Sequence, residues 1–449
     1  MVKPEHAAFG LSLRPPFRPS AVHVNRRHLA VAALGLLGIV GVVTYAMRLF
    51  GAWGDRHAWA YPAAMMMVLL SSVATAPLLA FASRATRGYW GLPARRAAEL
   101  FIIPSLLVYA LLIPVLATLP PLQGRANLWF NFGGGAPFVP EALAMAVFLL
   151  TGLALLWVSA VPDVAPPPSE LRLLPAWKRA LYLNWSGTRR QWQALRAAIK
   201  VLGAFYLMLY VFVQMILSTD IGQSLLPGWR SGVFPVYCAV SGIQSGLAVT
   251  VITIALLKKY SALGRFIGDE QAVSIGKIML GTTLMWIYNF WSDFMLVWYA
   301  RLPGEVAAIQ VLVAIVYKAS FLVALFGMFL IPFVGLIFNP VRRRLMRLRW
   351  IAVSILVGLV FDRIRLFVPS MTSADPFGHY EGGPLPGPVW PNAVDVLFIL
   401  GWIALVALAY LWAASRVPML VGWEMREAAL LRREAPFVRG HVLILGKPD

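Results

Sequence analysis

Residues 198–217, AIKVLGAFYLMLYVFVQMIL, decide the class of fold. Their one charge, Lys200, lies near the beginning of the run. A bilayer has a hydrocarbon core about 30 Å thick, which a helix of roughly 20 predominantly apolar residues crosses. The run therefore predicts a membrane-spanning helix that follows a basic segment and leads to the polar residues Gln214 and Asp220.

The composition of the whole chain extends this prediction. Of its 449 residues, 60% are hydrophobic and 13% are charged, and the mean hydropathy is +0.73, which is far from the balance of a soluble domain. Other apolar stretches of similar length alternate with charged or Pro- and Gly-rich connections. We predict an all-α integral membrane protein with about ten spans: 29–49, 59–82, 98–119, 141–161, 198–217, 233–257, 272–300, 312–338, 350–368 and 393–414.

The distribution of charge predicts the orientation. The net charge is +20, and 30 of the 39 Lys and Arg residues lie in the two tails and in every second connection. Basic loops stay on the cytoplasmic side, so both termini are expected there. A nucleic-acid site would instead gather its basic residues on one domain. The expected parts are a cytoplasmic tail (1–28), a membrane domain (29–414) and a cytoplasmic amphipathic tail (415–449).

Polar side chains inside spans are costly, so each is a candidate for function. In span 272–300, four side chains recur at helical spacing: Thr282, Trp286, Asn289 and Asp293. Asp293 falls in the outer third, where it could exchange protons with the exterior or accept a hydrogen bond from a ligand hydroxyl. The alternative is an aspartate held by interhelical hydrogen bonds or by a basic partner such as Arg230 or Arg301.

A cluster of charged residues is expected at the outer ends of spans 350–368 and 393–414. It consists of Asp362, Arg363, Arg365 and Asp395. For most of these residues, helix capping or pairing of surface charges is the expected role. Gln244, in span 233–257, is expected to hydrogen-bond between helices.

The sequence contains few residues that could bind a cofactor. Cys238 is the only cysteine, and an iron–sulfur cluster needs about four thiolates. None of the six histidines lies deep in a predicted span, so no haem with histidine ligands is expected. No phosphate-binding, dinucleotide-binding or His-rich metal motif appears, and we expect no metal site.

Several segments, read in order, resemble the membrane subunits of the polysulfide reductase family, also called NrfD-like. They are 161–163 (VPD), 183–192 (LNWSGTRRQW), 218–220 (STD), 227–235 (PGWRSGVFP), 245–246 (SG) and 294–305 (FMLVWYARLPGE). Together they are similar to the two ten-helix subunits of bacterial alternative complex III, and the last segment most resembles the second of these. The resemblance covers about residues 90–340.

The resemblance implies two four-helix bundles with flanking helices, beside an exterior iron–sulfur subunit, with a quinol pocket near the outer face in some members. The family's His-to-Asp pair falls on Gln214 and Asp220, so the aspartate is retained and the histidine is not. A glutamine can hydrogen-bond a quinol hydroxyl but cannot take its proton. This departure favours a scaffold, a proton conduit or a degenerate quinone pocket beside a fully equipped sister subunit.

The expected function is therefore that of a bacterial inner-membrane subunit of a quinol-oxidising respiratory complex, without a redox centre of its own. Its expected partners are a periplasmic iron–sulfur subunit, cytochrome c subunits and a second NrfD-like subunit. If this copy binds quinol, the expected site has proton acceptors (Asp220 and Asp293), orienting groups (Gln214 and Asn289) and ring-stacking walls (Trp229 and Trp286).

Two alternatives stay open. The chain could be a structural and proton-translocating subunit without bound quinone. It could also be a secondary transporter, although transporters often show Gly- or Pro-broken helices in matching halves, and no matched breaks are evident in the sequence.

Overall fold

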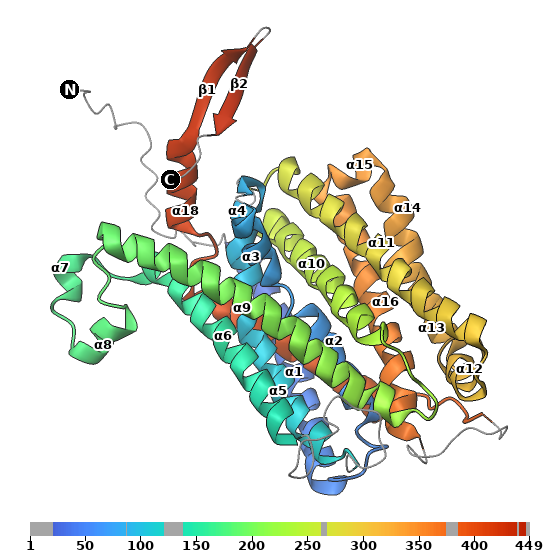
Figure 1. Cartoon of the computed structure of the whole chain (residues 1–449). Coiled ribbons are helices and arrows are strands. Elements are labelled where there is room, and N and C mark those ends of the chain that lie inside the picture. Colours follow the sequence, from blue (N-terminus) through green and yellow to red (C-terminus); the bar gives the residue numbers. More distant parts are fainter. Residues whose placement is uncertain are drawn as a thin grey trace, which may run out of the picture.

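A computed structural model describes residues 21–86, 88–120, 138–261, 267–373, 385–437 and 440–445. Long helices lie side by side through most of the molecule (Figure 1). The first half contains α1 (Ala21–Gly51), α2 (Ala60–Ser72), α3 (Leu78–Ala85), a 3-10 turn η1 (Tyr89–Gly91), α4 (Leu92–Glu99), α5 (Ile102–Ala117), α6 (Phe138–Val164), α7 (Pro168–Leu171), α8 (Ala176–Leu181), α9 (Arg189–Ile221) and a 3-10 turn η2 (Gln223–Leu225).

The second half is also mainly helical. It contains α10 (Phe234–Tyr260), α11 (Asp269–Ala300), α12 (Pro303–Ile309), a π-helical segment η4 (Gln310–Ala314), α13 (Lys318–Ala324), a second π-helical segment η5 (Leu325–Leu330), α14 (Ile331–Ile337), α15 (Asn339–Arg342), α16 (Leu345–Thr372), α17 (Ala393–Arg416), α18 (Gly422–Leu431), β1 (Arg432–Phe437) and β2 (Gly440–Leu445).

Seven helices in the described part of the chain are long and apolar enough to cross a membrane: His28–Gly51, Leu92–Ala117, Phe138–Val164, Arg189–Leu225, Phe234–Tyr260, Lys318–Ile337 and Ala393–Arg416. The prediction of a mainly helical chain with several helices able to cross a membrane is therefore confirmed. Helices α11 and α16 are also long but more polar, and α2 is short. That ten helices span the membrane, with both termini in the cytoplasm, stays a prediction.

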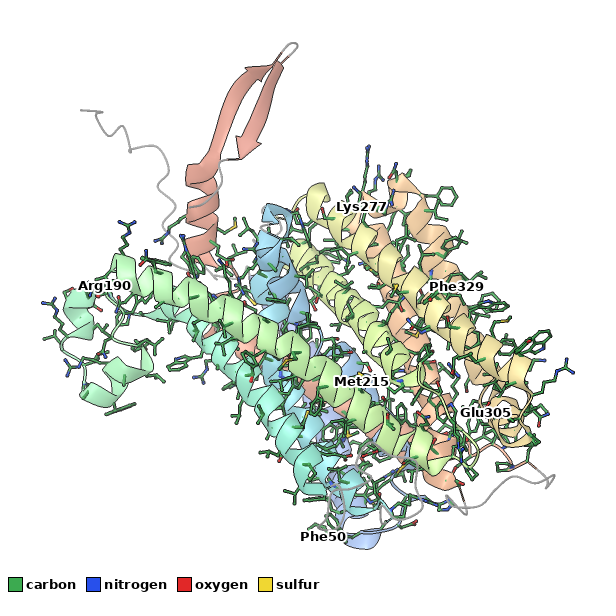
Figure 2. The ribbon with its side chains drawn as sticks, in the orientation of Figure 1. Phe50, Arg190, Met215, Lys277, Glu305 and Phe329 are labelled. Atoms are coloured by element: carbon green, nitrogen blue, oxygen red, sulfur yellow. The ribbon has the colours of Figure 1, made fainter. Side chains whose placement is uncertain are left out.

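The helices pack as two groups, and α1 and α17 form a separate pair. One group consists of α2–α3, α4–α5, α6 and α9, and the other of α10, α11, α12–α14 and α16. Helices α2, α10 and α16 join the two groups, and α1 packs along α17 beside them. In Figure 2, Arg190 and Lys277 lie near one end of the helices, and Phe50 and Glu305 lie near the other, which agrees with the sides predicted from charge.

The predicted span 59–82 is two helices rather than one. The chain leaves the helical path after Ser72 and resumes at Leu78. Pro77 lacks an N–H, which explains why the ladder of hydrogen bonds is interrupted there. Within the break, the Ala74 carbonyl accepts a hydrogen bond from Tyr206 Oη at 2.6 Å, and Thr75 Oγ1 donates to the Gly242 carbonyl at 3.0 Å. Side chains and backbone of other helices thus pair polar groups that lipid could not satisfy.

The predicted span 312–338 is also interrupted, and its interruption has no Gly or Pro to announce it. The π-helical segment η4 ends at Ala314, and Ile315 leaves the helical conformation with φ −124° and ψ −69°. The Ile315 N–H still donates to the Gln310 carbonyl at 2.8 Å. Beyond the break, Tyr317 Oη accepts a hydrogen bond from the Val389 N–H at 3.1 Å, which ties the break to the segment before α17.

The segment predicted as an amphipathic tail contains a β-hairpin. Strands β1 and β2 pair antiparallel, from Arg432 opposite Leu445 to Phe437 opposite Gly440. The hairpin extends from α18 away from the helices (Figure 1). An isolated two-stranded hairpin is marginally stable in water.

A buried ionic cluster lies in the first group of helices, at the end where α4 lies. Arg96 and Glu99 are fully buried one turn apart on α4, and their side chains approach to 3.2 Å. Arg96 also reaches Asp163 on α6 at 2.9 Å, and Ser159 Oγ donates to Glu99 at 2.9 Å. Buried charges are tolerated when they are paired and hydrogen-bonded, so this cluster requires α4 and α6 to keep their register.

Helix α18 docks on the same cluster through Glu424. This buried carboxylate lies 2.7 Å from Arg84 Nε and 3.0 Å from Arg95 Nη1. The preceding residue, Trp423, packs its ring 5.4 Å from that of Trp192 on α9. Burial alone would raise the pKa of the Glu424 carboxyl, but the two guanidinium groups hold that pKa below its ordinary value.

The docking of α18 should weaken in acid. Because the folded pKa of Glu424 is depressed, its contribution is present above the ordinary pKa of 4.5 and is lost as pH falls through the lower folded value. A nitroxide on Arg426→Cys should therefore be immobile at pH 7 and gain mobility below pH 4.5. Glu424→Gln should make it mobile at pH 7, whereas equal mobility of both proteins at pH 7 would refute this role. Labelling would be selective because Cys238 is buried.

The crossing of α1 and α17 depends on two glycines. A Cβ on Gly401 would lie 2.3 Å from the Cα of Gly41, so the two backbones are in direct contact there. Small residues permit such close approach between membrane helices.

We expect Gly401→Ala to destabilise the protein by about 1–3 kcal/mol, because neither backbone can yield without separating the helices. Gly35→Ala on α1 is the matched control, since no atom lies within 4 Å of the added Cβ. Unfolding of the detergent-solubilised chain by SDS measures both. Equal midpoints would show that the crossing contributes nothing to stability.

Candidate functional site

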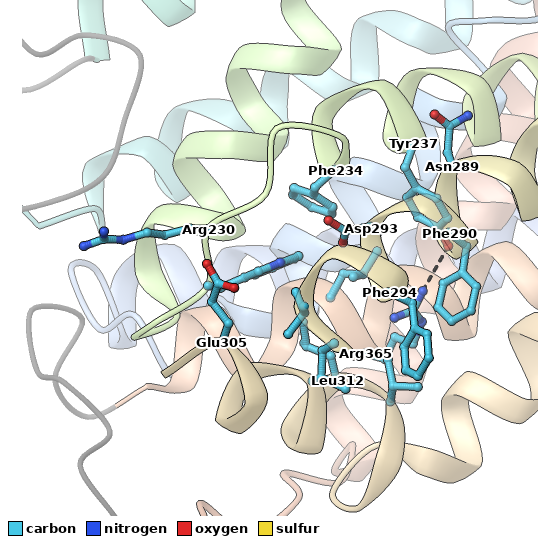
Figure 3. Close-up of a pocket in the computed structure, with 15 residues that line it drawn as sticks. Arg230, Phe234, Tyr237, Asn289, Phe290, Asp293, Phe294, Glu305, Leu312 and Arg365 are labelled. Atoms are coloured by element: carbon cyan, nitrogen blue, oxygen red, sulfur yellow. Dashed lines mark hydrogen bonds between the residues drawn. The ribbon is translucent and has the colours of Figure 1, made fainter. Parts of the chain in front are cut away.

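A cavity opens between the second group of helices and the loop before α10, at the end that carries Glu305 (Figure 3). About 580 Å³ of space lies between its side chains, part of it open to the surroundings. The lining comes from that loop, α10, α11, α12, η4 and α16: Trp229, Arg230, Phe234, Tyr237, Asn289, Phe290, Asp293, Phe294, Val297, Glu305, Ile309, Leu312, Val313, Arg365 and Leu366. Mostly apolar walls with a few polar groups are typical of a small-molecule site.

Asp293 and Glu305 are the acidic residues of this lining, and both are half-buried. Ser231, in the loop before α10, donates its hydroxyl to Asp293 Oδ1 and accepts a hydrogen bond from the Phe234 N–H at 2.9 Å. Within the described residues, Asp293 has no salt bridge. Of the two forms of the alternative role, the ion pair with Arg230 or Arg301 is absent from the described residues, and the hydrogen bond is present but comes from a loop rather than from another helix. That Asp293 exchanges protons or binds a ligand hydroxyl stays a prediction.

Aromatic rings from two parts of the chain line the cavity. The ring of Trp229 lies 4.3 Å from that of Phe234, and Phe290 and Phe294 follow on α11 with their centroids 6.2 Å apart. Trp286 does not line the cavity. It is fully buried behind Phe290, whose ring is stacked parallel to it at 6.0 Å.

Asn289 lines the cavity one turn before Asp293. Its Nδ2 donates to the Met285 carbonyl at 2.7 Å, within the same helix. This bond fixes the amide, and no described residue forms a hydrogen bond with its oxygen. The predicted role of Asn289 in orienting a ligand stays a prediction.

Arg365 connects the cavity to a buried ionic cluster. It lines the cavity and donates to Asp362 from Nη2 at 2.7 Å and from Nε at 3.0 Å. Tyr237, also in the lining, donates to Asp362 at 2.6 Å and accepts from Arg365 at 2.9 Å (dashed in Figure 3). These three side chains make one wall of the cavity continuous with the interior.

Arg363 extends the cluster toward α2. It reaches Asp362 at 2.7 Å, Ser241 Oγ on α10 at 2.5 Å and Ser71 Oγ on α2 at 2.9 Å. Asp362 and Arg363 are fully buried, and Arg365 is 3% exposed. The expected pairing is therefore present, but its assignment to the surface is wrong, because α16 turns these charges into the bundle rather than toward its outer end.

Asp395 does not belong to this cluster. It forms an ion pair with Arg48 on α1, and with Asn392 it caps α17 through reciprocal hydrogen bonds of 2.8 and 2.9 Å. The predicted roles in pairing and capping are confirmed for this residue. The interhelical role of Gln244 is also confirmed, since it donates to Thr283 and to the Met328 carbonyl.

The structure separates the residues proposed for a quinol site into two places. Trp229, Asn289 and Asp293 line the cavity, with Trp286 directly behind it. The other two residues, Gln214 and Asp220, lie on α9 and are fully buried. None of the described lining residues comes from α9. The amide of Gln214 has no hydrogen-bond partner among the described residues.

Sequence reasoning missed Tyr237 and placed Arg365 at the surface. A signal for Arg365 exists, because three charges within four residues of one apolar stretch are too costly to be left unpaired in a membrane. Tyr237 carries no such signal, since a tyrosine near the end of a span is ordinarily an interfacial anchor.

No family model matches this sequence, and a search of curated proteins finds no significant relative. Among the described residues, no group of three His, Cys, Asp or Glu side chains is arranged to hold a metal ion.

The buried cluster predicts a large effect of removing its one acid. Asp362→Asn leaves two buried guanidinium groups without a carboxylate, and we expect destabilisation by about 3–5 kcal/mol. Asp55→Asn, at an exposed position, should change stability by less than about 0.5 kcal/mol. SDS unfolding in detergent provides the comparison, and two indistinguishable variants would show that Asp362 is dispensable for the fold.

Proposed function

We propose that this chain is a membrane subunit of a quinol-oxidising electron-transfer complex of the bacterial inner membrane, and that its cavity binds the quinol head group. One observation carries this proposal: an aspartate without a salt bridge among the described residues lies in an aromatic cavity, and Arg365 in the wall of that cavity belongs to a buried cluster in which two guanidinium groups share one carboxylate. The resemblance to NrfD-like subunits supports it from the sequence.

The two aspartates have environments suited to different roles. Asp362 receives hydrogen bonds from two guanidinium groups and a phenol, which stabilise its charge. Asp293 receives one from the neutral Ser231 hydroxyl. Two acids whose surroundings differ in this way divide the work of acid–base chemistry. Asp293 is therefore the proposed proton acceptor, and Asp362 the fixed charge that holds Arg365 and Tyr237 in the wall.

Oxidation of a quinol releases two electrons and two protons. In the proposed site, Trp229, Phe234 and Phe290 hold the ring and Asn289 orients one hydroxyl. Asp293 accepts the two protons in turn and releases the first through the open side of the cavity before the second is transferred. Arg365 supplies positive charge where the oxygen loses that proton. The electrons pass to iron–sulfur and haem groups in partner chains, proposed to be an exterior iron–sulfur subunit, cytochrome c subunits and a second NrfD-like subunit.

Gln214 and Asp220 enter this proposal differently. Because α9 contributes no described residue to the cavity, they cannot act on a head group bound there. The proposal that Asp220 accepts protons rests only on its resemblance to the family motif. Gln214 is the proposed orienting group beside Asp220, at a place separate from the cavity.

A second candidate is proton translocation without bound quinone. It is favoured by the hydrogen-bonded series that runs from the cavity through Tyr237, Arg365, Asp362 and Arg363 to Ser71 on α2. A secondary transporter finds less support. The break after α2 lies in the first span of the first group, and the break after η4 lies in the third span of the second group. The two breaks therefore do not lie at corresponding places in two halves of the chain.

Substitution of Asp293 in the reconstituted complex tests the proposal. Asp293→Asn should lower quinol oxidation about 100-fold or more, the loss typical of a general base. Glu170→Gln, an exposed carboxylate on α7, is the matched control and should leave the rate unchanged.

The remaining outcomes separate the candidates. If Asp220→Asn and Asp293→Asn together leave quinol oxidation intact, the site assignment fails. If oxidation continues while proton translocation into vesicles stops, the second candidate is correct. Solute transport by the isolated chain would point to the transporter.

A further inference from the structure

The connection between α6 and α9 forms a small lateral projection, which we call the foot (residues 168–188). It contains α7 and α8 and the turn that leads into α9. In Figure 1 it lies outside the helical groups, beside the end at which α9 begins. No part of the cavity comes from the foot.

The foot exposes large apolar side chains. Leu173 is 85% exposed, Trp177 67% and Leu181 53%. Trp177 and Leu181 are four residues apart and therefore share one face of α8. A contiguous exposed face of this kind marks a surface that contacts a partner or a membrane.

The charge of the foot and its flanks is nearly of one sign. Residues 164–200 hold seven Lys and Arg residues and one acid, Glu170. Arg172 and Lys178 are exposed, and the ammonium of Lys178 lies 5.3 Å from the centroid of the Trp177 ring. Basic residues are thus interspersed with the apolar side chains along the foot, and Lys178 lies against the Trp177 ring.

The turn after α8 is held in a defined conformation. Leu183 and Asn184 adopt left-handed φ angles of 54° and 48°, which other contacts must maintain in non-glycine residues. The side chain of Gln191 supplies them. Its Nε2 donates to the Asn184 carbonyl at 2.9 Å, and its Oε1 accepts from the Ser186 N–H at 2.9 Å.

One hydrogen bond joins the foot to α6 and relates its depth to the predicted span. Trp157 Nε1 on α6 donates to the Leu181 carbonyl at 2.9 Å. Trp157 lies four residues before the end of the predicted span 141–161, which corresponds to about 6 Å along the helix axis. Amphipathic helices at membrane surfaces insert their apolar face about 5–10 Å into the boundary between head groups and acyl chains.

We propose that the foot is a docking surface for anionic phospholipids of the leaflet at this end of the protein. Trp177 and Leu181 enter the acyl region, while Arg172 and Lys178 bind phosphate groups. The lateral position, the depth and the single sign of charge all favour a lipid surface over a protein partner.

Depth measurement in nanodiscs tests the proposal. A nitroxide on Leu181→Cys should be accessible to oxygen and shielded from a water-soluble nickel chelate in nanodiscs that contain phosphatidylglycerol. Gln193→Cys, at an exposed position outside the predicted spans, is the control and should be accessible to the chelate. Both labels are selective because the native Cys238 is buried.

Charge reversal tests the head-group preference. Arg172→Glu with Lys178→Glu should lower the ratio of buried to exposed label at position 181 by roughly tenfold in phosphatidylglycerol. Arg342→Glu with Arg343→Glu makes the same charge change on a different loop and should leave that ratio unchanged.

Three results would overturn the proposal. The first is equal chelate access at positions 181 and 193 in anionic nanodiscs. The second is equal burial of the label at position 181 in anionic and zwitterionic lipid, which would show that the foot has no preference for anionic head groups. The third is shielding that requires other subunits, which would make a protein the occupant.

Discussion

Charged side chains inside an apolar helical bundle need partners from within the protein, since lipid offers none. In this chain that requirement joins helices far apart in the sequence. Asp362 and Arg363 on α16 reach α10 and α2, Arg96 on α4 reaches α6, and Arg48 on α1 reaches Asp395 on α17. Helix packing and charge pairing are therefore the same constraint, because a displaced helix would leave an ion unpaired.

The cavity depends on this constraint. Tyr237 and Arg365 belong both to its wall and to the ionic cluster, so their positions are determined from the buried side. Among the described residues, Asp293 forms its side-chain hydrogen bond with Ser231. The result is a wall held by ion pairs and hydrogen bonds in the same cavity as a carboxylate that accepts a hydrogen bond from a neutral hydroxyl. This difference between two acids of the same type, rather than the presence of acids as such, makes the cavity the best candidate for chemistry in the described part of the chain.

The helices and part of the site were predictable for different reasons. Span length and basic loops follow from composition, and helical periodicity correctly grouped Trp286, Asn289 and Asp293 around one region. The break near Pro77 could have been inferred from its missing N–H, whereas that after Ala314 has no local signal. Gln214 and Asp220 were grouped with the others through resemblance, and only packing shows that α9 does not contribute to the cavity.

The amino-acid sequence by itself determined which segments are apolar helices and which connections are basic, because both depend on side-chain chemistry counted along the chain. Tertiary structure decided which charges meet. Arg365 faces the cavity rather than the surface, and Asp395 finds Arg48 from the other end of the chain, because pairing depends on helix rotation and depth. Those quantities arise only when side chains from several helices compete for the same interior, so no single segment specifies them.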